Sequence, residues 1–151
     1  MIKKIQFLEV KKAKTKTYKI KNKNYFLNKK ILGRQYNKLS NNKNISRILI
    51  HKKNKTNVHQ MLIFQLKSYS ARIKKHPKKT KTYVSIEGKQ MIKIFSKDLK
   101  VIKSFILDKK NFICEIYKNT IHQNITLSKK SIHIETIPGP FNVKKDNIFF
   151  N

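Results

Sequence analysis

The feature that most constrains this fold is a series of short apolar segments, rich in β-branched residues and separated by basic loops. Residues 46–50 (SRILI) and 58–66 (VHQMLIFQL) flank the loop HKKNKTN, which carries three lysines. Residues 82–86 and 90–95 enclose the dipeptide Glu87-Gly88, a pattern that predicts a β-hairpin. Further alternating segments occupy residues 101–107, 111–117, 124–127 and 131–137.

No segment after Asn44 shows a strong helical period, so the sequence predicts an all-β fold. Five to seven short strands with basic loops are typical of a small OB-like Greek-key barrel. We expect three parts: a basic, irregular N-terminal arm over residues 1–44, the RNA-binding barrel over residues 45–140, and a short C-terminal tail over residues 141–151. The tail follows Pro138-Gly139-Pro140, which ends any strand because proline has no donor N–H.

The charge of the chain narrows the classes of partner. Lysine and arginine number 37 against 7 acidic residues, which gives a formal net charge of +30. Such a charge repels itself in a compact state and calls for a polyanion, with nucleic acid first and an anionic membrane second. Hydrophobic residues make up 38% of the chain, enough for a modest core. We therefore expect marginal stability without the partner.

The N-terminal arm interleaves lysines with Tyr18, Tyr25 and Phe26. Rings that stack on bases and lysines that meet phosphates are the means by which proteins bind single-stranded RNA. A disordered basic tail has the same composition, and the two interpretations are compatible, because a tail can become ordered on RNA.

Targeting signals are absent from the first residues. The start MIKKIQFLEVKKAK lacks the apolar run of a signal peptide and the arginine- and serine-rich character of a transit peptide. No apolar run approaches the roughly 20 residues of a membrane span. The bias toward lysine, asparagine and isoleucine is typical of an AT-rich coding sequence, as in some organelle genomes, so a chain that works in an organelle is expected to be encoded there.

Side chains that could take part in catalysis or metal binding are scattered along the sequence. The carboxylates form no pair, a glycine-rich phosphate loop is missing, and no nucleophile lies beside a base in the sequence. A single cysteine, Cys114, builds no disulfide and is expected to be a small buried residue. The five histidines have no supporting ligand pattern, so they are expected near phosphate or solvent rather than on a metal. The sequence thus predicts no enzyme, no metal and no cofactor.

Three stretches resemble a known family in order and spacing. SRILIHKKNKTNVHQMLIFQLK has, without a gap, the length of a family pattern, G-R-I-T-x-R-H-x-G-G-G-H-K-x-x-Y-R-I-x-D-F-K, and matches it at Arg47, Ile48, Ile63 and Lys67. RIKKHPKKTK matches a second stretch at Arg72 and Pro77, and NITLSKKSIHIETIPG is similar to a third. The chain resembles the first half of the L-two family of large-subunit ribosomal proteins, in an organellar version. Asn54, Lys55 and Thr56 replace the family's three glycines.

The resemblance implies a structural constituent of a mitochondrial large ribosomal subunit, which binds and organises large-subunit rRNA through barrel loops and arm. It also implies neighbouring ribosomal proteins, a separate chain that supplies the family's SH3-like half, and the OB-like fold. A free-standing organellar nucleic-acid-binding protein is the alternative function. The residues expected to contact RNA are Arg34, Lys38, Asn41, Asn42, Lys43, Arg47, His51, Lys52, Lys53, Lys55, His59, Lys67, Arg72, Lys74, Lys75, Lys78, Lys79, Lys81, Lys129 and Lys130.

Overall fold

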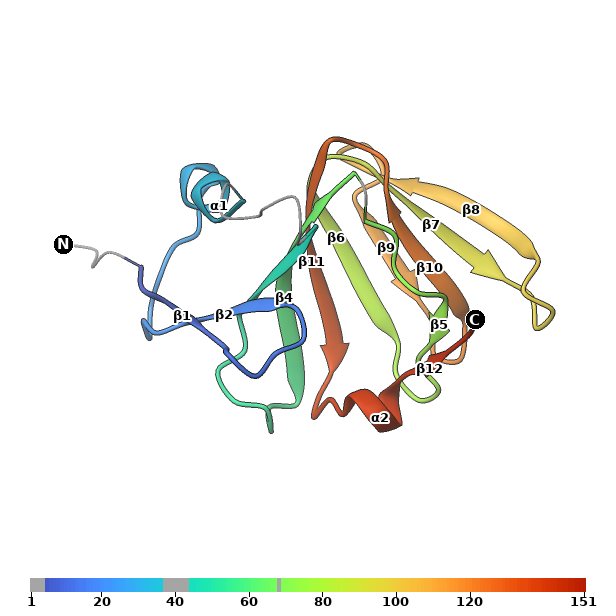
Figure 1. Cartoon of the computed structure of the whole chain (residues 1–151), viewed down its shortest axis with the longest axis horizontal. Helices are drawn as coiled ribbons and strands as arrows, with labels where there is room; N and C mark the ends of the chain where they lie inside the picture. Colours follow the sequence, from blue (N-terminus) through green and yellow to red (C-terminus); the bar gives the residue numbers. More distant parts are fainter. Residues whose placement is uncertain (1–4, 37–43, 68) are drawn as a thin grey trace.

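The computed structural model describes residues 5–36, 44–67 and 69–151, and these form two facing β-sheets with little helix (Figure 1). The seven-stranded sheet has the order β1 (Phe7–Glu9), β2 (Lys16–Ile20), β3 (Ile45–Leu49), β4 (Val58–Leu66), β11 (Lys130–Pro138), β6 (Lys81–Glu87) and β9 (Ile113–Ile116). The five-stranded sheet has the order β12 (Ile148–Phe149), β5 (Lys74–Lys75), β10 (Ile121–Thr126), β7 (Gln90–Phe95) and β8 (Val101–Leu107). The expected all-β, barrel-like class is confirmed.

The strand order is largely non-local. Strand β11 lies in the interior of the larger sheet, between β4 and β6, although about sixty residues separate β4 from β11 in the sequence. Its pairing with β4 is antiparallel and unbroken from Lys130↔Leu66 to Pro138↔Val58. Among the named strands, only β2 and β3 pair in parallel. The two-sheet arrangement therefore depends on β11, which joins segments from both halves of the chain.

The segment expected to be an irregular arm contributes regular structure. Strands β1 and β2 extend the larger sheet beyond β3, and α1 (Lys29–Tyr36) follows them. Asn28 caps the start of the helix, since its side-chain Oδ1 accepts a hydrogen bond from the backbone N–H of Ile31 at 3.0 Å. Sheet and helix thus continue into the first 44 residues (Figure 1).

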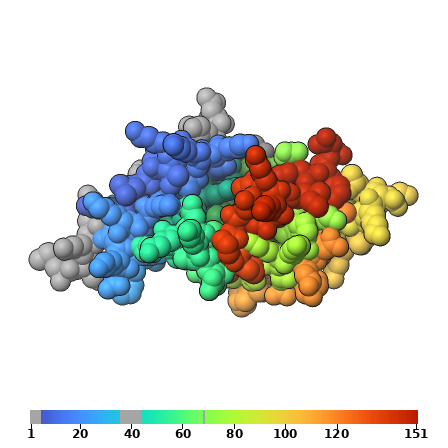
Figure 2. Space-filling model, turned by 90° about the horizontal axis from the view of Figure 1, so that it is seen from below, coloured from blue at the N-terminus to red at the C-terminus, as the bar shows by residue number. Residues whose placement is uncertain are grey.

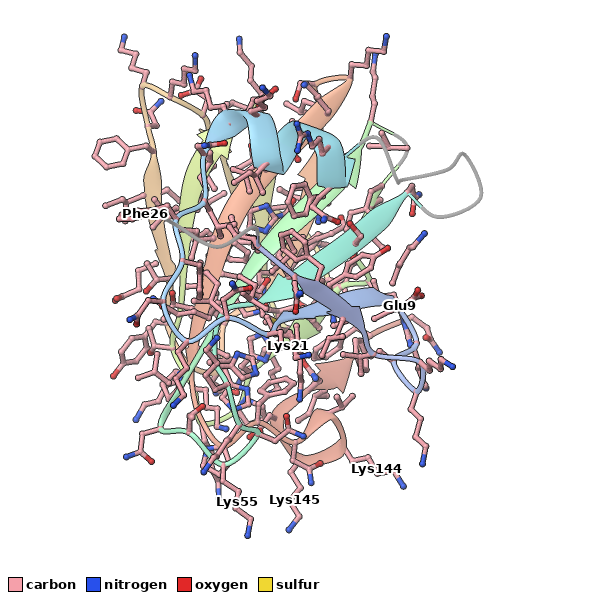
Figure 3. The ribbon with its side chains drawn as sticks, turned by 90° about the vertical axis from the view of Figure 1, so that its left-hand side faces the viewer. Glu9, Lys21, Phe26, Lys55, Lys144 and Lys145 are labelled. Atoms are coloured by element: carbon pink, nitrogen blue, oxygen red, sulfur yellow. The ribbon has the colours of Figure 1, made fainter. Side chains whose placement is uncertain are left out.

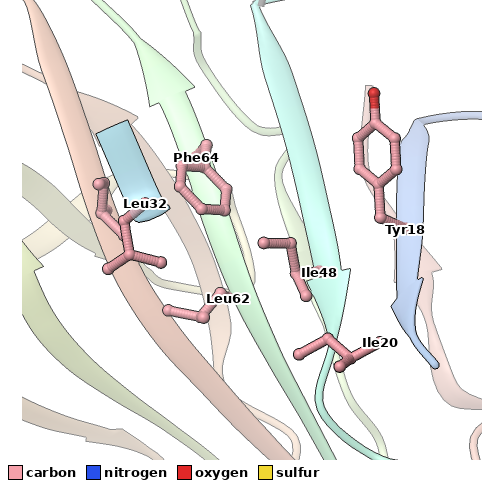
Figure 4. Packing of buried hydrophobic residues seen from close by; sticks show 7 residues of the cluster. Tyr18, Ile20, Leu32, Ile48, Leu62 and Phe64 are labelled. Atoms are coloured by element: carbon pink, nitrogen blue, oxygen red, sulfur yellow. The ribbon is translucent and has the colours of Figure 1, made fainter. Parts of the chain in front are cut away.

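An apolar cluster, the outer cluster, holds this N-terminal segment on the larger sheet (Figure 4). The helix contributes Leu32, and the strands contribute side chains that are at most 7% exposed. Phe64 is fully buried, and burial of a phenylalanine side chain stabilises a fold by about 1.5 to 3 kcal/mol. The strand members of the cluster are Tyr18, Ile20, Ile48, Leu62, Phe64 and Ile132.

A second apolar cluster, the inner cluster, lies between the two sheets. It joins Tyr83 and Cys114 of the larger sheet to Ile92 and Leu107 of the smaller one. Cys114 is 7% exposed, so the expected buried cysteine is confirmed. Burial raises the pKa of its thiol to about 11, which leaves it uncharged at neutral pH.

The C-terminal residues pack on the domain. After β11, α2 (Val143–Asp146) is capped at its start by Asn142, whose Oδ1 accepts a hydrogen bond from the backbone N–H of Lys144 at 3.0 Å. Strand β12 then pairs with β5 on the edge of the smaller sheet. In the view from below, these residues lie across the middle of the face, between the N-terminal strands at one end and β8 at the other (Figure 2).

Candidate functional site

The space between the sheets contains a polar region beside the inner cluster, which we call the lumen. Because successive strand residues point to opposite faces, alternate residues of the facing strands point into it. A cavity of about 30 Å³ lies there, close to the volume of one water molecule. Its lining comprises Ile45, Arg47, Ile63, Gln65, Tyr69, Ala71, Lys74, Tyr83, His122, Asn124 and Glu135.

Strand register brings the charged side chains of the lumen to one level. On the smaller sheet, Lys74 of β5 lies directly opposite His122 of β10. On the larger sheet, Glu135 of β11 lies opposite Tyr83 of β6. Paired residues on neighbouring strands share a face, so each pair points to the same side of its sheet. Two sheets that face each other therefore bring a lysine, an imidazole, a phenol and a carboxylate together.

In the lumen, the carboxylate of Glu135 interacts with more than one cationic side chain. Lys81 Nζ lies 3.0 Å from Glu135 Oε1, and the lysine side chain is 2% exposed. Burial alone would raise the pKa of Glu135, but Lys81 and Lys74 outweigh it and hold that pKa well below its usual range. The positive charge of Lys81, followed by burial, lowers the pKa of Lys74 to about 7. Lys74 is therefore partly uncharged at neutral pH.

Two buried imidazoles present an unprotonated nitrogen. The Nδ1–H of His76 donates to the carbonyl of Asp146 at 2.8 Å, and that of His122 donates to the carbonyl of Thr120 at 2.9 Å. The rings are 5.3 Å apart. Burial and the charge of Lys81 lower the pKa of His76 to about 4 and that of His122 to about 3, so both are neutral at pH 7. Among the described residues, neither Nε2 has a hydrogen-bond partner.

A hydrogen-bonded network closes the part of the lumen next to β7. Gln90 Nε2 donates to Nδ1 of His133 at 2.6 Å and to Oγ of Ser131 at 3.1 Å. Asn124 Nδ2 donates to Oε1 of Gln90 at 2.8 Å, whereas the Oδ1 of Asn124 lacks a partner within the described residues. The network fixes its side chains, because moving one of them would leave buried polar atoms unsatisfied.

The C-terminal segment closes the end of the lumen beside His76. Lys79 Nζ lies 2.9 Å from Oδ2 of Asp146 and also donates to the carbonyl of Pro140. The ring of Phe141 lies 6.3 Å from that of His76 in an edge-on arrangement. At the same end of the molecule, Lys144 and Lys145 project outward, as does Lys55 of the β3–β4 loop (Figure 3).

The donor set of the lumen does not fit a metal ion. Across residues 5–36, 44–67 and 69–151, no group of three or more His, Cys, Asp and Glu side chains is arranged to hold one. His76 and His122 lie beside Lys74 and Lys81, whose charges lower the pKa values of both imidazoles and oppose any cation. Neither of the helices described here is long and apolar enough to span a bilayer.

The residues expected to contact RNA separate into groups. Arg47, Lys74 and Lys81 meet around the lumen, and four predicted residues, Lys38, Asn41, Asn42 and Lys43, lie outside the described residues. His59 is buried, and His51 stacks on it with ring centroids 4.0 Å apart. Half-buried positions are occupied by Lys75, Lys79 and Lys130, of which Lys130 lies 2.9 Å from Glu87. Exposed positions are occupied by Arg34, Lys52, Lys53, Lys55, Lys67, Arg72, Lys78 and Lys129.

The expected place of the histidines near phosphate or solvent is wrong for four of five. His59, His76, His122 and His133 are 1–6% exposed. Each of these four side chains points into the protein. There, one ring nitrogen of each histidine is hydrogen-bonded to a backbone carbonyl or, for His133, to the side chain of Gln90. A sequence signal for the lumen existed: polar residues recur at every second position, as in Lys81-x-Tyr83, His122-x-Asn124-x-Thr126 and Ser131-x-His133-x-Glu135.

Comparison with known proteins shows the fold. No protein-family model and no curated protein matches the chain. Solved structures that resemble it include the capsular polysaccharide assembling protein CapF from Staphylococcus aureus, with a TM-score of 0.61 and 13% identity over 70% of this chain and 31% of that one. Oxalate oxidase in complex with glycolate has a TM-score of 0.51 and 12% identity, over 62% of this chain and 46% of that one. Oxalate decarboxylase of Lactobacillus farciminis, in a formate complex, has a TM-score of 0.52 and 12% identity, over 63% and 27%.

The fold is cupin-like. This matches the two facing sheets, since cupins are double-sheet jelly rolls. The chain spans about a third to a half of the length of CapF and oxalate oxidase, so the activities of those whole proteins are not transferred by the likeness.

The comparisons overturn three sequence-based predictions. The function as an rRNA-binding constituent of an organellar ribosome, and its alternative as a free-standing nucleic-acid-binding protein, are contradicted by neighbours that are cupin-like proteins. The prediction that the chain is not an enzyme is contradicted because those neighbours include an oxidase and a decarboxylase. Short basic stretches carried the ribosomal resemblance, and they report charge and strand spacing rather than the order of strands in a sheet. The mitochondrial location and the second, SH3-like chain stay predictions.

Proposed function

We propose that this chain is a cupin-fold enzyme that takes a small carboxylate as substrate into its lumen. The observation that carries the proposal is the imbalance of charge around the cavity, where Arg47, Lys74 and Lys81 meet one carboxylate, Glu135. Lys81 has Glu135 as its close ion-pair partner. The Nε of Arg47 is buried without a partner among the described residues, which leaves a fixed donor for an anion.

The charge of the whole chain supports the same class of ligand. The cavity of about 30 Å³ is close to the volume of one water molecule, so a carboxylate enters it only if the lining side chains move. The net charge of +30 draws anions toward the protein from solution. Among similar structures, oxalate oxidase was solved with glycolate and oxalate decarboxylase with formate, both small carboxylates.

The test must separate lumen binding from general attraction of anions. Titrations of formate, acetate and glycolate, followed by NMR shifts of the lumen histidines, compare the native chain with Lys74→Met and Lys75→Met. Both variants lose one lysine from the same short strand, but successive residues of a strand face opposite ways. We expect Lys74→Met to weaken binding at least about tenfold, because a bound carboxylate would hold Lys74 in its charged form, and removing a buried charge partner costs more affinity than removing a charge at the rim. Equal losses in both variants, or no saturable binding, would refute the proposal.

A further inference from the structure

Lys74 occupies an unusual position for a lysine. It belongs to the two-residue strand β5, is half-buried, and lines the cavity opposite His122. Its side chain contacts that of Lys81, which is itself held by Glu135 on β11 at 3.0 Å. A lysine placed beside a second cation is activated as a nucleophile, because the neighbouring charge favours its uncharged amine.

Charged and titratable groups face Lys74 from every strand packed around it. The larger sheet supplies Lys81 and Tyr83 from β6, Glu135 from β11 and Arg47 from β3. The smaller sheet supplies His122, and Lys74 and His76 belong to the same segment, two residues apart. Of these groups, Lys81 and Arg47 oppose a charge on Lys74, whereas only Glu135 favours one. The balance favours a free amine next to an arginine.

We propose that Nζ of Lys74 forms an imine with the carbonyl carbon of a small 2-oxo acid bound in the lumen. This inference rests on the proposed function, because Arg47 would hold the carboxylate of the same molecule. The amine adds to the carbonyl carbon, and the carbinolamine then loses its oxygen as water. Both protons that leave Nζ end on that water, so the reaction needs no oxidant or reductant. The Nε2 of His122, which is unprotonated, lies on the same face as Lys74 and passes a proton from nitrogen to oxygen.

The cavity of about 30 Å³ is smaller than a 2-oxo acid, so the lining side chains must move for one to bind, and covalent capture reduces the room required. Imine formation replaces a van der Waals contact between nitrogen and carbon by a bond and releases the carbonyl oxygen as water. An adduct therefore needs less room than the ligand and the free lysine together. A two-carbon acid such as glyoxylate is the smallest probe that carries both a carboxylate and a carbonyl group.

Borohydride trapping tests the proposal on the intact chain. The protein is incubated with glyoxylate and sodium borohydride at pH 7, digested, and analysed by mass spectrometry. Reduction of the imine fixes a carboxymethyl group on the reacting nitrogen. We expect Lys74 to be labelled at least about tenfold faster than exposed lysines such as Lys53 and Lys78, in keeping with its pKa of about 7. Formate in excess should slow labelling of Lys74 and leave the exposed lysines unaffected.

The variant Lys74→Arg separates this inference from the proposed function. Arginine is positively charged, as Lys74 would be beside a bound carboxylate, but it forms no borohydride-reducible imine under these conditions. Formate should therefore still bind while fast labelling disappears. Folding of the variant is checked by circular dichroism, and Lys75→Arg serves as the matched control. Labelling that is equal for all lysines, while formate binds the lumen, would overturn the imine and leave the proposed function intact. Absence of both formate binding and fast labelling would overturn both.

Discussion

Two faces of the same three strands show how differently one sheet is used. On β3, β4 and β11, the face toward α1 carries Ile48, Leu62, Phe64 and Ile132 of the outer cluster. The opposite face carries Arg47, Gln65, His133 and Glu135, which point into the lumen or its polar network. The two sets alternate residue by residue along each strand.

The comparison teaches that, in this chain, residues that stabilise the fold and residues that line the lumen are neighbours in the sequence and do not form separate regions. The outer cluster is apolar and contributes through burial of its surface, which does not depend on pH. The lumen face holds charges and neutral imidazoles away from water, which costs free energy unless each group is partnered. On β4 or β11, substitutions at two successive residues should therefore differ in kind: one removes buried apolar surface, and the other disturbs buried polar or charged groups.

The largest expected effect is acid destabilisation that comes from the buried histidines of the lumen. His76 and His133 have pKa values of about 4, and His122 has a pKa of about 3, all below the ordinary 6.5. Between these values and 6.5 the unfolded chain binds more protons than the folded one, so the unfolding free energy falls as pH falls. From pH 7 to pH 5 the three histidines together should remove roughly 5 kcal/mol.

Urea unfolding at a series of pH values measures this loss. In His122→Gln the unfolding free energy lost between pH 7 and pH 5 should be smaller by about 2 kcal/mol, because one of the three groups no longer titrates. A stability that is flat from pH 7 to pH 5 would show that the histidines are solvated, and the contrast between the two faces would then fail.

A smaller effect, independent of pH, is expected on the outer face. Phe64→Ala removes a fully buried ring and leaves a cavity, which costs about 3 to 5 kcal/mol of unfolding free energy. The same loss at pH 7 and pH 6 would confirm that this face does not titrate. Gln60→Ala on the same strand is the control, since Gln60 is exposed and its truncation should change stability by less than about 0.5 kcal/mol. A loss at Phe64 no larger than at Gln60 would contradict the assignment.

Much of the fold could be predicted from the sequence, because strands have a local pattern of alternating apolar residues. The predicted segments 58–66, 90–95 and 101–107 coincide with β4, β7 and β8. Strand β2 was missed because lysines 16 and 19 hide the alternation of Tyr18 and Ile20. The sheet order was beyond reach, since the pairing of β4 with β11 is set by the packing of both faces and not by any local pattern.

The candidate site was predicted only in part. Arg47, Lys74 and Lys81 were singled out for their charge, but lysines are almost never fully buried, so they were assigned to the surface. Their burial follows from even spacing: Lys81 precedes the buried Tyr83 by two residues, and His122 precedes Asn124 in the same way. The partners that give the lumen its chemistry, above all Glu135, lie on strands that only the folded sheet brings alongside.

The last expected effect reverses the usual sign. Lys74→Met should raise the unfolding free energy at pH 7, since it removes a cation from beside Lys81 and replaces it with an apolar side chain. The folded-state pKa of Lys74 is about 7 and the ordinary value is 10.5. Between them the unfolded chain binds the extra proton, so the native protein gains stability as pH rises. The advantage of the variant should therefore be greatest below pH 7 and should vanish toward pH 10. Lys75→Met, measured alongside, should show no such trend. If Lys74→Met were less stable than the native chain at every pH, then favourable contacts would hold Lys74 in place, and it would not be kept under electrostatic strain for binding.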